Sequence, residues 1–216
     1  MNNITPIVKN LLIINIIFFF ATWLFQQQGI ALEQYLAVFY FDSPNFKIWQ
    51  PITYMFMHGN LTHIFFNMFA LYSFGSILEA HWGAKRFINF YLITGLGALA
   101  LQWGVQAFEV YQLTGSSVHD LATLTVQNES DLRTLQQIYF GPMVGASGAI
   151  FGLLVAFGML YPNLEMYIMF IPVPVKAKYI VPVYIVLELV LGFSKIEGDS
   201  VAHFAHLGGA LIGYIL

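Results

Sequence analysis

The sequence predicts an all-α polytopic membrane protein, a bundle of six transmembrane helices with a membrane-associated first loop. Of its 216 residues, 58% are hydrophobic and only 9% are charged, whereas soluble domains contain about 25% charged residues. So few charges do not cover a surface that faces water. The hydrophobic residues also fall into long runs between polar segments, as in a chain that crosses a bilayer repeatedly. The length fits one membrane domain, 1–216.

Composition excludes several classes of function. The chain has no cysteine, so it forms no disulfide, no cysteine metal site and no cysteine nucleophile. Its net charge of -3 is small and spread along the chain, which predicts no nucleic-acid partner. We expect no cofactor and no metal.

Six apolar runs predict the transmembrane helices, at about 11–25, 61–80, 87–108, 144–161, 179–193 and 201–216. The first run is followed by three glutamines and lacks a small-residue cleavage site, so we expect a retained span and not a signal peptide. The last run has 16 residues. As a helix it measures about 24 Å, against about 30 Å for a bilayer core, so we expect this span to be truncated.

The segments between the runs differ in character. The first, 29–59, is rich in aromatic residues and poor in charges, which predicts a loop lying in the headgroup region. The segment 109–137 is the most polar of the chain and predicts a water-exposed loop. A short proline-rich link joins the fourth and fifth runs.

Positive charges favour one orientation. With six spans, both ends of the chain lie on one side of the membrane, together with five of the eight Lys and Arg residues, namely Lys9, Lys85, Arg86, Lys176 and Lys178. Because cytoplasmic loops are enriched in such residues, we expect a cytoplasmic N-terminus. Ser147, which begins the fourth run, then lies near the outer face. The absence of a targeting extension favours a bacterial plasma (inner) membrane.

Small residues surround Ser147. Gly148 and Gly152 form a small-xxx-small pair on the fourth run, and Gly209 and Gly213 form one on the sixth. Such pairs let two helices approach closely, which would bring Ser147 within reach of a histidine on the sixth run. The simpler interpretation is that the serine only allows close helix packing, as most membrane serines do.

Two histidines of the sixth run are candidates for the partner of Ser147. His206 has glycines three and seven residues later and therefore shares the glycine face, whereas His203 lies one turn nearer the outer surface. A histidine exchanges protons near neutral pH, and we expect His206 to be the base. No acid is placed to orient it, since Asp199 lies in a turn, so we predict a dyad. The roles of His203 and Glu188 stay open.

His63 and Asn67 are four residues apart and share one helical face. Both donate hydrogen bonds and, with the backbone N–H of Ser147, would stabilise a developing oxyanion. The alternative is that they only bridge helices through buried hydrogen bonds. Metal binding by the histidines is disfavoured, because no His-Glu-x-x-His motif is present.

Three stretches together resemble the rhomboid intramembrane serine proteases. They are 58–67 (HGNLTHIFFN), 145–148 (GASG) and 205–209 (AHLGG) followed by Gly213. The resemblance implies Ser147 as nucleophile, His206 as general base, and His63 and Asn67 as oxyanion donors. It also implies a mobile fifth loop and helix that gate lateral substrate entry.

Two positions depart from that family pattern. Many rhomboids carry Trp-Arg in the first loop where this chain has Trp49-Gln50, a change expected to loosen the loop. Several carry tyrosine four residues after the serine, against the histidine ring, where this chain has Phe151, which could stack on the ring but could not form a hydrogen bond. Neither change removes a catalytic atom.

The expected function is hydrolysis of peptide bonds in or near the transmembrane segments of substrate proteins within the lipid bilayer. The alternative is a catalytically silent rhomboid-like protein that binds membrane helices. A small transporter would show repeated halves with broken helices, and no repeat is visible.

Overall fold

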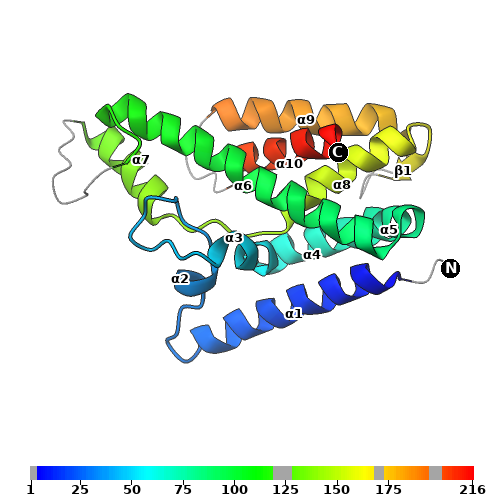
Figure 1. Cartoon of the computed structure of the whole chain (residues 1–216), viewed down its shortest axis with the longest axis horizontal. Helices are drawn as coiled ribbons and strands as arrows, with labels where there is room; N and C mark the ends of the chain where they lie inside the picture. The colour runs from blue at the N-terminus through cyan, green and yellow to red at the C-terminus, as the bar shows by residue number, and fades with distance from the viewer. Residues whose placement is uncertain (1–3, 119–127, 168–172, 195–200) are drawn as a thin grey trace.

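The computed structural model describes residues 4–118, 128–167, 173–194 and 201–216. They form a helical bundle (Figure 1). The longer helices are α1 (Pro6–Gln26), α4 (Leu61–Ala70), α5 (Ser76–Trp82), α6 (Ala84–Thr114), α7 (Glu129–Phe140), α8 (Ser147–Leu160), α9 (Ala177–Ser194) and α10 (His203–Ile215). A π-helical segment, η2 (Leu71–Gly75), joins α4 to α5.

Among the described residues, four helical stretches are long and apolar enough to cross a membrane by length and composition: 6–26, 61–82, 84–114 and 177–194. They coincide with four of the six predicted spans, and the chain is an integral membrane protein. The runs 144–161 and 201–216 contain α8 and α10, which are apolar but only 14 and 13 residues long. The count of six spans therefore stays a prediction.

Two features lie beyond what the sequence pattern predicted. Helix α6 continues past residue 108 to Thr114 and ends at Gly115, whose φ of 81° gives a left-handed C-terminal cap. The proline-rich link contains a two-stranded antiparallel sheet of β1 (Glu165–Tyr167) and β2 (Pro174–Lys176). The segment 109–137 is accordingly partly helical, with the end of α6 and most of α7.

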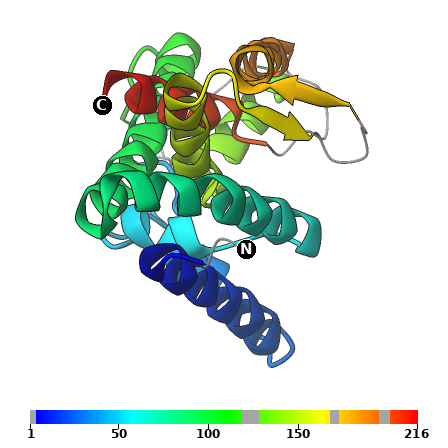
Figure 2. The ribbon, with the colours of Figure 1, turned by 90° about the vertical axis from the view of Figure 1, so that its right-hand side faces the viewer.

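Helices α6, α8 and α10 pack against one another as the centre of the bundle, and Figure 2 shows α8 and α10 side by side. The glycine faces meet there as predicted. A β-carbon at Gly213 would lie 2.6 Å from the Cα of Gly152, and one at Gly209 would overlap the carbonyl oxygen of Gly148. Only glycine permits this approach, which brings α8 and α10 into backbone contact.

Helix α1 lies on one side of this centre and α9 on the other (Figures 1 and 2). The N-terminal end of α1 is held by Glu79 of α5, a buried residue whose carboxylate accepts hydrogen bonds from Ile7 N at 2.9 Å and Val8 N at 2.8 Å. A carboxylate on the unpaired N–H groups of a helix start is stabilising. It fixes α1 to α5.

The first loop contains α2 (Glu33–Leu36), α3 (Gln50–Thr53) and a 3-10 turn, η1 (Tyr54–Phe56). Gln50 was expected to loosen it, but its side chain is fully buried and closes a turn, bonding Asn45 O at 3.1 Å and Lys47 N at 3.0 Å. Gln50 therefore fastens the loop internally.

The loop is also tied to the helices around it. Trp103 of α6 donates to Phe39 O at 3.0 Å, and Tyr139 of α7 donates to Asp42 at 2.9 Å. Val38 and Met143 exchange two backbone hydrogen bonds of 3.0 and 2.8 Å. The loop thus supports the segment that leads into Ser147.

Candidate active site

Ser147 is the first residue of α8, and the residues before it set its position. Gly145 has φ 135°, a conformation that other residues rarely adopt, and a β-carbon there would lie 2.9 Å from His63 Nε2. The Gly145 N–H donates to Tyr54 O at 2.9 Å. The first loop thereby anchors the turn that presents the serine.

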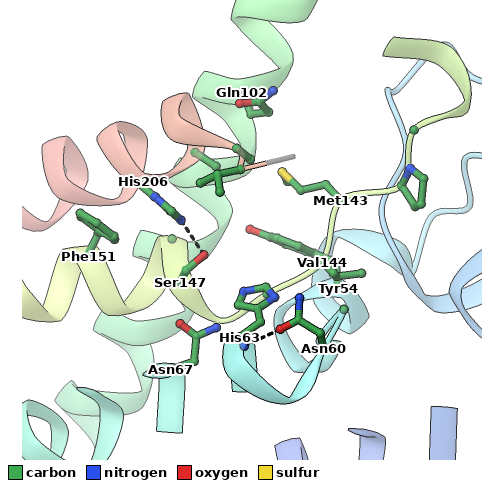
Figure 3. A pocket seen from close by; sticks show the side chains of 18 of the residues that line it. Tyr54, Asn60, His63, Asn67, Gln102, Met143, Val144, Ser147, Phe151 and His206 are labelled. Atoms are coloured by element: carbon green, nitrogen blue, oxygen red, sulfur yellow. Dashed lines mark hydrogen bonds between the residues drawn. The ribbon is translucent and has the colours of Figure 1, made fainter. Parts of the chain in front are cut away.

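The structure brings Ser147 and His206 together. Ser147 Oγ lies 2.8 Å from His206 Nε2 (Figure 3). The imidazole ring stacks on Phe151 at a centroid distance of 4.4 Å and an interplanar angle of 8°. Phe151 is one turn after Ser147 on the same helix, so α8 supplies both the hydroxyl and the surface that orients the ring. With an unprotonated Nε2, the hydroxyl donates its proton to the imidazole.

The expectation that no acid lies beside His206 is wrong. Glu188 of α9 places Oε2 2.9 Å from His206 Nδ1 and 2.7 Å from His203 Nδ1. Periodicity alone does not give the rotation of one helix against another, so the sequence did not show which face of α9 meets α10. Asp199, the acid considered earlier, lies outside the described residues.

His63 and Asn67 line the same cavity as Ser147 and His206. Asn60 caps α4 by accepting from His63 N at 2.8 Å, which starts the helix that carries both side chains. Asn67 is buried, and its Nδ2 has no hydrogen-bond partner within the part of the chain that the structure describes. Buried donors are rarely left unpaired, so the amide of Asn67 has capacity for a hydrogen bond that the described residues do not use.

The cavity has a volume of about 1010 Å³ and lies between the first loop, α4, α6, α8, α10 and the segment before Ser147. Its walls include polar side chains that the sequence reasoning passed over, namely Glu33, Gln102, Gln106 and Gln137. Gln102 and Gln106 were detectable, since they are polar residues four apart in an apolar run. Their polar side chains allow water to contact part of the cavity wall.

His58 does not line the cavity. It is 3% exposed and lies behind His63, with ring centroids 5.0 Å apart. Burial, together with the neighbouring His63, lowers the pKa of His58 to about 3. His58 is therefore a neutral packing partner of His63.

Comparisons with known proteins agree with these motifs. The Rhomboid domain model matches residues 45–216. Similar relatives include the Rhomboid protease AarA of Providencia stuartii, 29% identical over 78% of this chain and 54% of its own length. Rhomboid protein 1, mitochondrial, of Saccharomyces cerevisiae is 29% identical over 89% of this chain and 45% of its own.

The Rhomboid protease GlpG of Yersinia pestis is 24% identical over 87% of this chain and 53% of its own length. The chain spans about half the length of these curated relatives. The family model itself covers most of the chain, and it includes all three of the motifs that build the cavity. The chain belongs to the rhomboid family.

Proposed function

We propose that this protein is an intramembrane serine protease, which hydrolyses peptide bonds in or near the transmembrane segments of membrane proteins. One observation carries the proposal. Ser147 Oγ and His206 Nε2 are 2.8 Å apart at the wall of a large cavity inside an apolar bundle. A serine within hydrogen-bond distance of a histidine is the arrangement that activates a hydroxyl for nucleophilic attack. The protease names of two relatives support the same reaction.

In the first step, Ser147 Oγ attacks the carbonyl carbon of the peptide bond, and its proton passes to His206 Nε2. The carbonyl oxygen becomes an oxyanion. Asn67 Nδ2, the His63 ring and the Ser147 N–H are the donors proposed for it. The N–H of Ser147 belongs to the first turn of α8, where backbone donors have no partner in the helix and the helix dipole favours negative charge.

In the second step, His206 gives the proton from Nε2 to the leaving amine, and the carbon–nitrogen bond breaks. Water then attacks the acyl-enzyme while His206 takes its proton, and Ser147 is released when that proton returns to Oγ. The polar cavity wall of Gln102, Gln106 and Gln137 supports delivery of that water.

The substrate is proposed to be a membrane-embedded segment that enters sideways and unwinds locally to expose one carbonyl. The place of α9 at the margin of the bundle supports entry beside it (Figure 2). The distribution of Lys and Arg supports a cytoplasmic N-terminus and a site opening to the outer face of the membrane.

The test combines covalent labelling with cleavage. Detergent-solubilised protein is treated with a fluorescent fluorophosphonate, and a transmembrane model substrate is followed on a gel. We expect wild type to be labelled and to cleave, and Ser147→Ala and His206→Ala to do neither. Ser73→Ala is the matched control, because Ser73 is another membrane-helix serine whose hydroxyl, among the described residues, bonds only Phe69 O one turn earlier.

Cleavage that persists in folded Ser147→Ala would refute the assignment. Folded wild type that takes no label and cuts no substrate would instead indicate the silent helix-binding form of the family.

A further inference from the structure

Glu188 lies in the middle of α9, with its side chain 13% exposed. A carboxylate inside a membrane-spanning helix is costly unless it is partnered, and it usually marks a functional position. The partners of Glu188 come from the neighbouring helix, α10. They are His203 and His206, one turn apart.

One oxygen, Oε2, serves both histidines. The hydrogen bond with His203 Nδ1 is 2.7 Å long and well directed. His206 Nδ1 is 2.9 Å from the same oxygen, but the N–H does not point along that line, so the contact is close without being a formed hydrogen bond. Catalytic hydrogen bonds are often misaligned in a free enzyme and tighten when substrate binds.

We propose that Glu188 is a positioning residue for His206 and that His203 in turn holds Glu188. This inference rests on the proposed protease function. The relay runs through four side chains on three helices: Ser147 on α8, His206 on α10, Glu188 on α9 and His203 on α10.

The chemistry follows from the two nitrogens of His206. A neutral imidazole carries one proton, and His206 accepts from Ser147 only when that proton is on Nδ1 and Nε2 is free. A carboxylate beside Nδ1 favours this tautomer, and it also stabilises the imidazolium that forms when Nε2 takes the serine proton. Glu188 itself stays ionised throughout, so no further proton is transferred.

Phe151, which stacks on His206, cannot select the tautomer of the imidazole. Phe151 fixes the plane of the His206 ring, but its side chain has no polar atom that distinguishes one tautomer from the other. Within the described part of the chain, Glu188 Oε2 is the acceptor that lies within ion-pair distance of His206 Nδ1. Orientation of the ring and choice of tautomer are thus assigned to different helices.

A shared metal ion is a weaker explanation of this cluster. Glu188, His203 and His206 place ligand-type atoms within 4.8 Å of one another. Two ligands on one tetrahedral zinc, each with a bond of about 2.0–2.1 Å, would be about 3.3 Å apart. The observed separations of 2.7 and 2.9 Å are those of direct contacts between the side chains.

The test is Glu188→Gln, which keeps size and removes charge, measured as kcat and KM against pH with a chelator present. We expect kcat to fall by about 10²-fold with KM nearly unchanged. This loss is smaller than that caused by losing the orienting acid of a Ser-His-Asp triad, because Phe151 still holds the His206 ring. The described titratable groups that face His206 are Glu188 on α9, His203 on α10 and His63 on α4. Because Glu188→Gln removes a charge next to the proposed base, the acidic limb of the activity profile should shift.

Glu79→Gln is the matched control, since Glu79 is also a buried glutamate in a helix but, within the described part of the chain, its carboxylate bonds only the start of α1. It should lower thermal stability without moving the acidic limb. A Glu188→Gln enzyme with wild-type kcat and pH profile would overturn the inference, as would a limb that moves equally in Glu79→Gln.

A second pair of variants covers the case in which Glu188→Gln does not fold. His203→Phe removes the donor to Glu188, whereas His203→Asn keeps an N–H group near the place of Nδ1. The relay is supported if the asparagine variant keeps the wild-type activity and pH profile and the phenylalanine variant loses them. Equal behaviour of the two variants overturns it. Loss of activity in Ser147→Ala tests the proposed function separately, so failure of the relay leaves the protease assignment standing.

Discussion

Gly209 faces Gly148 so closely that a β-carbon on Gly209 would overlap the Gly148 carbonyl oxygen. Ser147 is the neighbour of Gly148, and His206 is one turn before Gly209. The 2.8 Å separation between Ser147 Oγ and His206 Nε2 therefore depends on two helices whose backbones touch at glycines, with no side chain between them. Reactivity of the serine and packing of the helices are set by the same contact.

Gly209→Ala should accordingly damage both properties. The added methyl group forces α8 and α10 apart, at a cost of about 1–3 kcal/mol for overpacking. We expect a lower melting temperature and at least a tenfold slower fluorophosphonate labelling. Gly104→Ala is the control, because Gly104 lies within α6 and, apart from its own helix backbone, no described atom lies within 4 Å of its β-position. Equal behaviour of the two variants would disprove the packing argument.

Asn67→Ala should lower kcat by about 10²- to 10³-fold, as loss of one oxyanion donor does in other serine proteases. KM should change little, because the donor acts on charge that develops in the transition state. Steady-state cleavage of a transmembrane substrate in detergent measures both constants. Unchanged kcat in the folded variant would leave Asn67 with only a packing role.

Glu79→Gln should destabilise the protein by about 1–3 kcal/mol, the usual range for weakening a charge-assisted hydrogen bond. The amide keeps one acceptor, but its NH₂ group then faces a backbone N–H of Ile7 or Val8. Thermal unfolding in detergent reports the loss. Labelling of the fraction that remains folded should match wild type, and a selective loss of labelling would contradict the separation of this contact from the site.

Burial of His58 should make the stability of the fold sensitive to acid. Its pKa is about 3 in the folded protein and about 6.5 when exposed. Between these values the unfolded chain binds a proton that the folded protein does not, so stability falls as pH drops below about 6.5 and continues to fall toward 3. Melting temperatures measured from pH 7 to pH 4 should decrease less in His58→Phe than in wild type. Parallel curves for the two proteins would contradict this origin.

Much of the bundle could be predicted from the sequence, because apolar runs and glycine spacing are local patterns. Gly148, Gly152, Gly209 and Gly213 predicted which faces meet, and the structure brings those faces into contact. The candidate site followed for the same reason, since Ser147 and the histidine of the glycine face lie beside those residues.

The missed features depend on non-local geometry. Glu188 contacts His206 only because of the rotation of α9 against α10, which no periodicity in either helix records. The β1–β2 pair forms in a proline-rich stretch whose composition indicates only a turn, and Pro174 lies within β2 itself. Gln50 was interpreted by comparison with arginine, yet its role follows from the turn that it closes at Asn45 and Lys47.

The bond between Glu79 and the start of α1 has a consequence for biogenesis. Its two ends are 71 and 72 residues apart in the chain, and α1 comes first. A ribosome adds about 5–20 residues per second, so α1 is made roughly 4–14 s before the carboxylate that holds it. During that interval the helix resides in the bilayer without its permanent neighbour. The bond that docks the first helix therefore cannot form until the second membrane-spanning stretch has been made.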